Sequence, residues 1–478
     1  MTYDFTALAP ALPEIALAVV AMALLVLGAF MGNRSAAVIS ALSAASLLGA
    51  AVLAAFAPLG EIFNGAFVMD SLAVFAKVAI YVASAVCIVL GQGWLARAND
   101  AKFEFPILVL LAAVGMSMMV SSGDLISLYI GVELHSLALY VLAAFRREDA
   151  RGSEAGLKYF VLGSLSSGIL LYGISLTYGF VGSLQYDAIA AAVAGGAGPG
   201  AVFGLVFIIC GLAFKVSAAP FHMWTPDVYE GGPTPMVAFF TSAPKLAAMV
   251  LFARLLGDGF FGALEQWQQV LMVIAAISFA VGAFGGLVQR NLRRLLAYSS
   301  IANIGYALLG IAAGTEAGLQ AMLVFMVLYM IDVTAFFACI MALRRDGREI
   351  DTIDGLAGLK REKPGLAIAI TILSLSVLGM PPFSGFWAKF YVFKAAIAAG
   401  LWPIAVAGLV ASVVAAFYYL RIIKVMWFDP APGPAEGSPA EAKWIAIGGA
   451  AFSFPIVLLV LAWLDPAALN AASVFGLQ

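Results

Sequence analysis

The sequence predicts an all-α polytopic membrane protein. Of its 478 residues, 63% are hydrophobic and 11% are charged, whereas soluble domains average roughly 45–50% apolar and about 25% charged residues. A water-soluble globule of this composition would have too few polar residues to cover its surface. The apolar residues also gather in runs of about 20, the length that crosses a bilayer as a helix. These observations exclude a cytosolic enzyme and a disordered chain, and a formal net charge of -2 gives no reason to expect nucleic acid as a partner.

Apolar runs between polar breaks predict 14 membrane-spanning helices. Residues Gly123 and Asp124 separate the fourth run from the fifth. No lysine or arginine precedes the first run, so we expect a retained helix rather than a cleaved signal peptide. The runs cover residues 9–31, 35–57, 71–95, 105–122, 124–144, 156–181, 201–222, 234–257, 266–288, 294–313, 318–343, 366–399, 402–426 and 444–464.

The loops are strongly asymmetric in positive charge, which predicts the orientation. One set of alternate loops carries nearly all the loop lysines and arginines, and the other set carries only Arg254. Because positive loops stay in the cytoplasm, both termini are expected on the opposite, periplasmic side of a bacterial inner membrane. The segment 427–443 is rich in proline and glycine and is interpreted as a linker.

Two spans are irregular, which indicates repeated halves. The seventh runs into Pro220, and the twelfth is about 34 residues long and contains the sequence from Gly379 to Gly385. Proline interrupts a helix, and interrupted helices in corresponding positions mark the transport site of many transporters. Five spans separate the two, so the repeats would be inverted. The predicted domains are an N-terminal three-helix segment (1–104), two inverted repeats (105–257, spans 4–8, and 258–426, spans 9–13), and a linker with a C-terminal helix (427–478).

Ionisable residues inside the spans are the candidate functional groups, since each costs roughly 2.5–3.5 kcal/mol at mid-bilayer on insertion scales. Glu133 and Lys245 lie too far from either span end to reach water, and Lys215 and Lys389 lie beside the two irregular segments. A nearby carboxylate favours a charged lysine while desolvation disfavours it, so these four residues could hand protons along the membrane plane.

Other polar residues allow less specific interpretations. Lys394 lies where a lysine can extend to the headgroups, and for Lys77 that remains one of two open interpretations. Glu14 is interpreted as a helix-start acid. Asp332 is either a counter-charge for Lys389 or a helix-packing acid. The two histidines give no metal-ligand spacing, so no metal site is expected; His135 is interpreted as a packing residue, and His222 could buffer proton uptake.

The stretch from Gly211 to Pro235, GLAFKVSAAPFHMWTPDVYEGGPTP, resembles the signature of the antiporter-like subunits of respiratory complex I, a family that includes Mrp-type sodium/proton antiporter subunits. The resemblance covers essentially the whole chain. Within the family, one subunit group has lysine rather than glutamate in the twelfth span, and this chain, with Lys389, resembles that group. The resemblance implies that Glu133 and Lys215 form a switching pair, Lys245 a central relay and Lys389 the exit-side carrier, with Lys158 and Glu154 as nearby modulating residues.

The implied function is proton translocation coupled to NADH:quinone electron transfer in partner subunits. Those partners, including neighbouring antiporter-like subunits, would hold FMN, the iron–sulfur clusters, NADH and quinone, and this chain would hold no cofactor. The main alternative is an Mrp-type Na⁺/H⁺ antiporter subunit. A second alternative is a scaffold whose buried charges only fix helix packing. Copurification with flavin and iron–sulfur subunits would separate the first alternative from the complex I interpretation.

Overall fold

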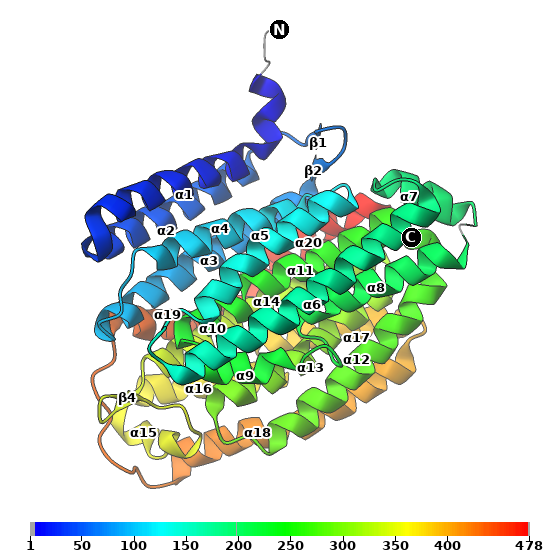
Figure 1. The fold of residues 1–478 in the computed structure, drawn as a ribbon. Coiled ribbons are helices and arrows are strands. Elements are labelled where there is room, and N and C mark those ends of the chain that lie inside the picture. The colour runs from blue at the N-terminus through cyan, green and yellow to red at the C-terminus, as the bar shows by residue number, and fades with distance from the viewer. Residues whose placement is uncertain (1–4, 197, 477–478) are drawn as a thin grey trace. The chain divides into compact units, whose positions relative to one another are not determined.

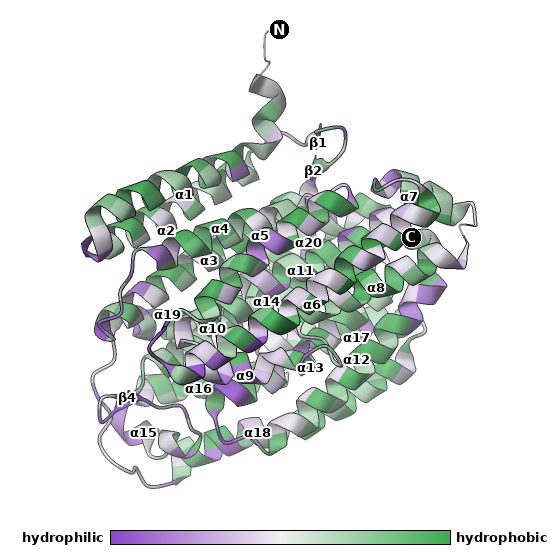
Figure 2. Cartoon of the chain, viewed as in Figure 1, coloured by the Kyte–Doolittle hydropathy of each residue, from purple (hydrophilic) through white to green (hydrophobic). Residues whose placement is uncertain are grey.

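The computed structural model describes residues 5–196 and 198–476, and it is built almost entirely of helices (Figure 1). Within these residues, 11 helical stretches are long and apolar enough to cross a membrane. Each apolar run in the sequence is helical over most of its length, so the prediction of an all-helical polytopic membrane protein is confirmed. Figure 2 shows hydrophobic residues along the lengths of the helices and hydrophilic residues in many of the connecting segments.

Contacts along the chain divide it into two compact units. The first unit comprises residues 1–216, 243–270 and 467–478, and the second comprises 217–242 and 271–466. Residues 1–4 and 477–478, which the predicted end domains include, lie outside the described part of the chain.

The first unit contains the N-terminal helices. Its elements are η1 (Phe5–Ala11), α1 (Leu12–Met31), η2 (Gly32–Ser35), α2 (Ala36–Ala55), β1 (Gly60–Ile62), β2 (Phe67–Met69), α3 (Ser71–Arg97), α4 (Glu104–Val120), α5 (Leu125–Ala143), α6 (Ala150–Val181), α7 (Tyr186–Ala194), α8 (Pro199–Val216), α11 (Ala243–Arg254), η3 (Leu255–Gly259), η4 (Phe261–Ala263) and η7 (Ser473–Phe475).

The second unit contains most of the remaining helices, and α12 (Leu264–Leu287) and α20 (Val457–Ala472) run from one unit into the other. Its own elements are α9 (Trp224–Gly231), α10 (Thr234–Thr241), α13 (Leu292–Ala312), α14 (Glu316–Met341), β3 (Arg344–Arg345), β4 (Arg348–Glu349), η5 (Asp354–Leu356), α15 (Leu359–Glu362), α16 (Pro364–Leu378), α17 (Ser384–Ala398), α18 (Trp402–Phe428), α19 (Ala440–Ala451) and η6 (Phe452–Ile456).

Polar side chains at the helix starts satisfy backbone donors that have no partner inside a helix. Asp70 caps α3 by accepting from the amide of Ala73, Asp124 caps α5 through Ser127, and Thr315 caps α14 through Gly318. Caps of this kind fix where each helix begins after a loop. Residues 429–439, within the segment interpreted as a linker, contain no helix or strand.

Helices are interrupted at three places near the buried lysines. α8 ends at Val216, where Ser217 has a left-handed φ of 69°, and α9 starts only at Trp224. α16 ends on Gly379, which has a φ of 96°, and α17 begins at Ser384. A third interruption, which the sequence analysis missed, separates α10 from α11 at Ser242. Proline lies within each of the first two breaks and two residues after the third, but Ser242 stands in an otherwise continuous apolar run.

Two short hairpins were not predicted. β1 pairs antiparallel with β2 between α2 and α3, and β3 pairs with β4 after α14. Their strands are only two or three residues long, too short for a period-two pattern to be recognised in the sequence. They close loops and leave the all-helical class unchanged.

An ion pair lies inside the N-terminal helices of the first unit. Lys77 on α3 is fully buried, and its Nζ lies 2.6 Å from Oε1 of Glu14 on α1. The same ammonium group contacts Sδ of Met69 at 3.2 Å and lies 4.5 Å from the centre of the Phe67 ring. Headgroup contact is therefore the wrong interpretation for Lys77. Glu14 does lie in the first turn of its helix, but its carboxylate also neutralises a buried lysine.

We expect the single substitution Glu14→Gln to destabilise the first unit by about 3–5 kcal/mol, because it leaves a buried ammonium group without its counter-charge. The double substitution Glu14→Leu with Lys77→Met should restore most of this loss, because it removes both charges. The measurement is the thermal unfolding midpoint of the assembled protein in detergent. Equal destabilisation by the single and the double variant would contradict a paired charge.

Candidate functional site

The centre of the first unit holds a carboxylate and an ammonium group joined by one hydroxyl. The Ser167 hydroxyl on α6 donates to Oε1 of Glu133 on α5. Nζ of Lys215 on α8 donates to the same hydroxyl oxygen at 3.2 Å. Glu133 is half-buried and Lys215 is buried. The structure therefore brings together the pair that the sequence analysis singled out, through a serine that it did not single out.

The ammonium group of Lys215 has hydroxyl partners for each of its three N–H donors. Besides Ser167, Nζ donates to Oγ of Ser136 at 2.9 Å and to the Tyr140 hydroxyl at 3.2 Å. A hydroxyl can accept from an ammonium group and can also donate to the lone pair of a neutral amine. The same three partners can therefore satisfy Lys215 in both of its charge states.

Local sequence explains why these groups meet. Lys215 lies in the last turn of α8, one residue before the helix ends, so its side chain is fixed at the interruption. Helices α6 and α8 approach so closely that a Cβ atom at Gly173 would lie 2.7 Å from the carbonyl oxygen of Gly204. Ser166 adds a hydrogen bond to the Gly211 carbonyl at 3.1 Å. This contact places the neighbouring Ser167 against Lys215.

Lys245 lies in the first turn of α11, directly after the interruption at Ser242, and is 1% exposed. Helix α11 packs against α8, α3 and α4 within the first unit. The side chain of Lys245 is therefore enclosed by protein. The interruption puts this lysine next to a helix start rather than in the middle of a straight helix.

Lys389 in the second unit is hydrogen-bonded to the C-terminal end of α16. Its Nζ donates to the carbonyl of Leu378, the last residue of α16, at 2.9 Å, and to Oγ of Ser412 on α18 at 2.8 Å. The ammonium group also lies 4.7 Å from the centre of the Tyr306 ring, within cation–π range. The unpaired carbonyls at a helix C-terminus carry partial negative charge, so the break itself supplies part of the counter-charge.

Asp332 does not pair with Lys389, and its interpretation as that counter-charge is wrong. It is buried on α14 and accepts hydrogen bonds from Ser376 and Ser384 at 2.6–2.9 Å. Ser384 and Lys389 are five residues apart on α17, a separation that turns their side chains to different faces of the helix. The two groups therefore occupy separate polar clusters at the same interruption.

The remaining candidates lie outside these clusters. Glu154 and Lys158 are exposed on α6 and pair with each other at 2.8 Å. His222 is half-buried in the segment between α8 and α9. His135 is buried on α5, 3.5 Å from Oγ of Ser136, as expected for a packing residue.

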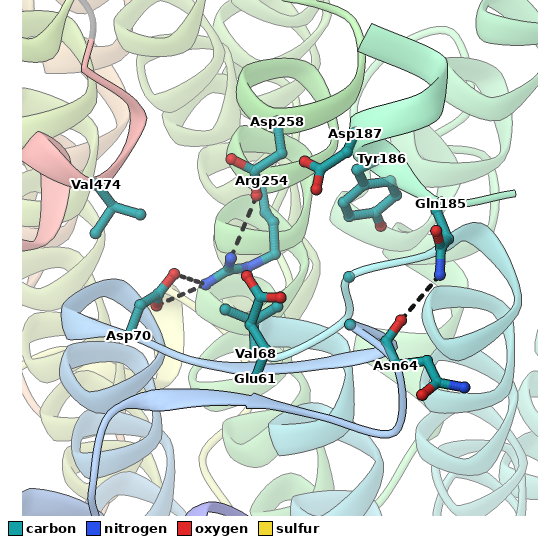
Figure 3. A pocket seen from close by; sticks show the side chains of 12 residues that line it. Glu61, Asn64, Val68, Asp70, Gln185, Tyr186, Asp187, Arg254, Asp258 and Val474 are labelled. Atoms are coloured by element: carbon teal, nitrogen blue, oxygen red, sulfur yellow. Dashed lines mark hydrogen bonds and ion pairs between the residues drawn. The ribbon is translucent and has the colours of Figure 1, made fainter. Parts of the chain in front are cut away.

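A second polar site, which the sequence analysis missed, opens in the first unit around Arg254 (Figure 3). Arg254 is the last residue of α11 and is 1% exposed, so its assignment to a loop is wrong. It donates to both carboxylate oxygens of Asp70 at 2.7 and 2.8 Å, to Asp258 at 3.3 Å and to the Val120 carbonyl at 2.8 Å. The pocket beside it encloses about 300 Å³ and is also lined by Glu61 and Asp187. Asp258, four residues further along the chain, and the distant Asp70 thus allow an arginine to be buried.

An apolar helical bundle with buried lysines held by hydroxyls and broken-helix carbonyls is the construction of a membrane protein that moves ions or protons. The comparisons with known proteins specify the class. Residues 122–415 match the family model described as NADH:quinone oxidoreductase/Mrp antiporter, TM.

Two relatives carry the name NADH-quinone oxidoreductase subunit N. The protein of Caulobacter sp. (strain K31) is 64% identical over 80% of this chain and 81% of its own length. That of Rhodospirillum rubrum is 49% identical over 94% of each chain. A chain of respiratory complex I from Thermus thermophilus superimposes with a TM-score of 0.81 at 32% identity, covering 96% of this chain and 99% of that one.

The chain belongs to the subunit N family of NADH-quinone oxidoreductase, the antiporter-like, proton-translocating membrane subunits of complex I. This is the subunit group that the lysine at position 389 suggested. A chain of the Mrp complex from Dietzia has a TM-score of 0.83 but only 23% identity, so it shows a shared fold alone. The comparisons thus favour the complex I interpretation over the Mrp-type alternative.

We expect Ser167→Ala to lower both NADH-driven quinone reduction and proton pumping by about tenfold, the effect of a barrier raised by roughly 1.4 kcal/mol. The substitution removes the one hydroxyl shared by Glu133 and Lys215. Ser164→Ala, an exposed serine on the same helix, is the matched control and should leave both rates unchanged. Equal rates in the two variants would show that the bridge has no part in transport.

Proposed function

We propose that this chain carries protons across the membrane through three buried lysines, Lys215, Lys245 and Lys389, with Glu133 and Lys215 as the switching pair. The observation that supports this most is the Ser167 hydroxyl between the two side chains. It gives a carboxylate and a lysine a hydrogen-bonded connection that needs no intervening water.

The Ser167 hydroxyl allows a proton to pass from Lys215 to Glu133. The Ser167 oxygen takes a proton from the Lys215 ammonium group, and the serine's own proton passes to the Glu133 carboxylate. Lys215 becomes a neutral amine, Glu133 becomes a neutral acid, and the serine is unchanged. Because both charges vanish together, no unpaired buried charge remains. The reverse transfer restores the ion pair.

The other buried groups extend this route. We assign Lys245 as the central relay and Lys389 as the exit-side carrier, with Asp332 beside the same helix break. His222 is a candidate for proton uptake near the break that follows Lys215. Lys158 and Glu154 are exposed on α6, so we place any effect they have at the surface of this helix.

The proposed topology has 14 spans. It is obtained by joining α10 with α11, α16 with α17, and α19 with α20 as single interrupted spans, and it contains two inverted repeats. The interruptions after Lys215 and before Lys389 support the repeat, since each places a lysine beside free helix-end groups. The domain limits remain those predicted at residues 104, 257 and 426. Positive charge in the loops supports a bacterial inner membrane with both termini on the periplasmic side.

The energy for transport comes from partner subunits in this proposal. Moving one charge against 100 mV requires about 2.3 kcal/mol, and the partners would supply it by passing electrons from NADH through FMN and iron–sulfur clusters to quinone. The direct neighbours of this chain would be other membrane subunits of complex I, including antiporter-like ones, and lipids.

Lys389→Met and Lys394→Met form a matched pair on α17. Lys389 is buried at the helix break, whereas Lys394 is exposed, as expected for a headgroup-facing lysine. We expect Lys389→Met to reduce NADH-driven proton pumping at least about tenfold and Lys394→Met to leave it unchanged. The measurement is acidification of inverted membrane vesicles, with the amount of assembled complex determined for each variant.

Replacing potassium by sodium salts in the same vesicles separates proton transport from sodium transport. Acidification that is independent of sodium supports a proton carrier. Normal pumping by Lys389→Met in a fully assembled complex would contradict the proposed route.

A further inference from the structure

A compact cluster of hydroxyls surrounds Asp332 at the interruption between α16 and α17. Ser376 from α16 and Ser384 from α17 both lie within hydrogen-bond distance of the carboxyl group, at 2.6 and 2.8 Å from Oδ2. The two serine oxygens are 2.7 Å apart, and Ser384 is 2.7 Å from Oγ of Ser453 in η6. All four side chains are buried.

The number of hydrogens in this cluster depends on the charge of Asp332. Four oxygen–oxygen contacts need a hydrogen each: Asp332 with Ser376, Asp332 with Ser384, Ser376 with Ser384, and Ser384 with Ser453. The three serines supply three hydroxyl hydrogens. An ionised Asp332 would leave one contact as two bare oxygens at hydrogen-bond distance in a buried site, which is costly. A protonated carboxyl group supplies the fourth hydrogen.

One arrangement then satisfies every contact. The carboxyl group donates to Ser376, Ser376 donates to Ser384, and Ser384 donates back to the other carboxyl oxygen at 2.9 Å. Ser453 donates to Ser384. The amide of Gly385 donates to Oγ of Ser376 at 2.9 Å, so each serine oxygen accepts no more bonds than its two lone pairs allow.

We propose that Asp332 holds a transferable proton, and that this proton joins α16 to α17 across the break beside Lys389. When the carboxyl group gives the proton to a water molecule, one of the four contacts loses its hydrogen. The serine pair that joins the two helix ends then has to separate or rotate. Asp332 thus acts as a positioning residue for Lys389, on the assumption that the proposed proton route through Lys389 is correct.

The connection to Lys389 runs through the end of α16. Ser376 lies two residues before Leu378, whose carbonyl accepts from Nζ of Lys389. A movement of Ser376 away from Ser384 therefore moves the carbonyl that holds the lysine. Release of the Asp332 proton would change how tightly Lys389 is bound without any direct contact between the two side chains.

Other charged groups lie on or near the elements that pack against α14, but serine hydroxyls surround the Asp332 carboxyl group, with Ser376 and Ser384 at 2.6–2.9 Å. Helices α16 and α10 bring no ionisable side chain. The titratable groups on α14 itself and on the elements facing it are Glu316, Tyr329, Cys339, Arg293, Arg294, Tyr298, Tyr306, Lys389, Tyr391, Lys394, Glu441, Lys443 and Asp465.

Infrared spectroscopy of the assembled complex in native membranes tests the protonation. A rise from neutral to alkaline pH should remove one C=O stretch of a protonated carboxyl group, a band that shifts in D₂O. The band should be missing from Asp332→Asn and present in Asp465→Asn, the matched control, whose acid lies outside the cluster. Identical bands in wild type and Asp332→Asn would show that Asp332 is already ionised and would overturn the proposal.

Ser453→Ala gives a second readout if Asp332→Asn fails to assemble. Ser453 lies 2.7 Å from Oγ of Ser384, and its removal takes one hydroxyl and its hydrogen from the cluster. The carboxyl band should persist at a changed frequency, and an unmoved band would mean that it does not arise from Asp332.

Proton pumping by Asp332→Asn tests the transport role separately. Asparagine keeps hydrogen-bond donors at this position but cannot release a proton, so pumping should fall while assembly is normal. Normal pumping would show that the proton only holds the helices together, which would refute its proposed release. Both outcomes are independent of Lys389→Met, so failure here is distinguishable from failure of the proposed function.

Discussion

The cost of placing a charge inside an apolar helical bundle determines how every ionisable group in this structure is held. An isolated buried charge is destabilising by several kcal/mol, and the four buried cations Lys77, Arg254, Lys215 and Lys389 each have specific partners. Two solutions recur. Lys77 with Glu14, and Arg254 with Asp70 and Asp258, are direct ion pairs. Lys215 and Lys389 are instead held by hydroxyls and, for Lys389, by a helix-end carbonyl.

In the proposed function, the two solutions distinguish structural charges from proton-carrying lysines. A direct ion pair favours one charge state of both partners, which suits a fixed link between helices. A hydroxyl can donate or accept and therefore tolerates a lysine that gains and loses a proton. Helix interruptions also provide partners for a lysine, because they free carbonyl groups inside the membrane that only protein or water can satisfy. Both features concentrate at Lys215 and Lys389.

Much of the fold could be predicted from the sequence because its strongest signal is the length of the apolar runs. The same runs place Glu133, Lys215, Lys245 and Lys389 inside predicted spans. The hydrogen-bond partners of these lysines could not be predicted, since serine is common in the spans and nothing in the local sequence marks Ser167 or Ser412 as a partner. Arg254 was assigned to a loop because it lies at the end of a run, and only the fold brings Asp70 to it. The interruption at Ser242 lacks a glycine signal, and its neighbouring proline fits a helix start.

Replacement of Lys215 by Met in the intact membrane complex tests the central claim most directly. NADH-driven quinone reduction and proton pumping are measured together in the same membranes, with assembly checked by the amount of complex. If Lys215 is a coupled proton carrier held by switchable hydroxyls, both activities fall together while assembly is normal. If both activities are unchanged, the hydroxyl-lined lysine is structural and the proton route described here is wrong.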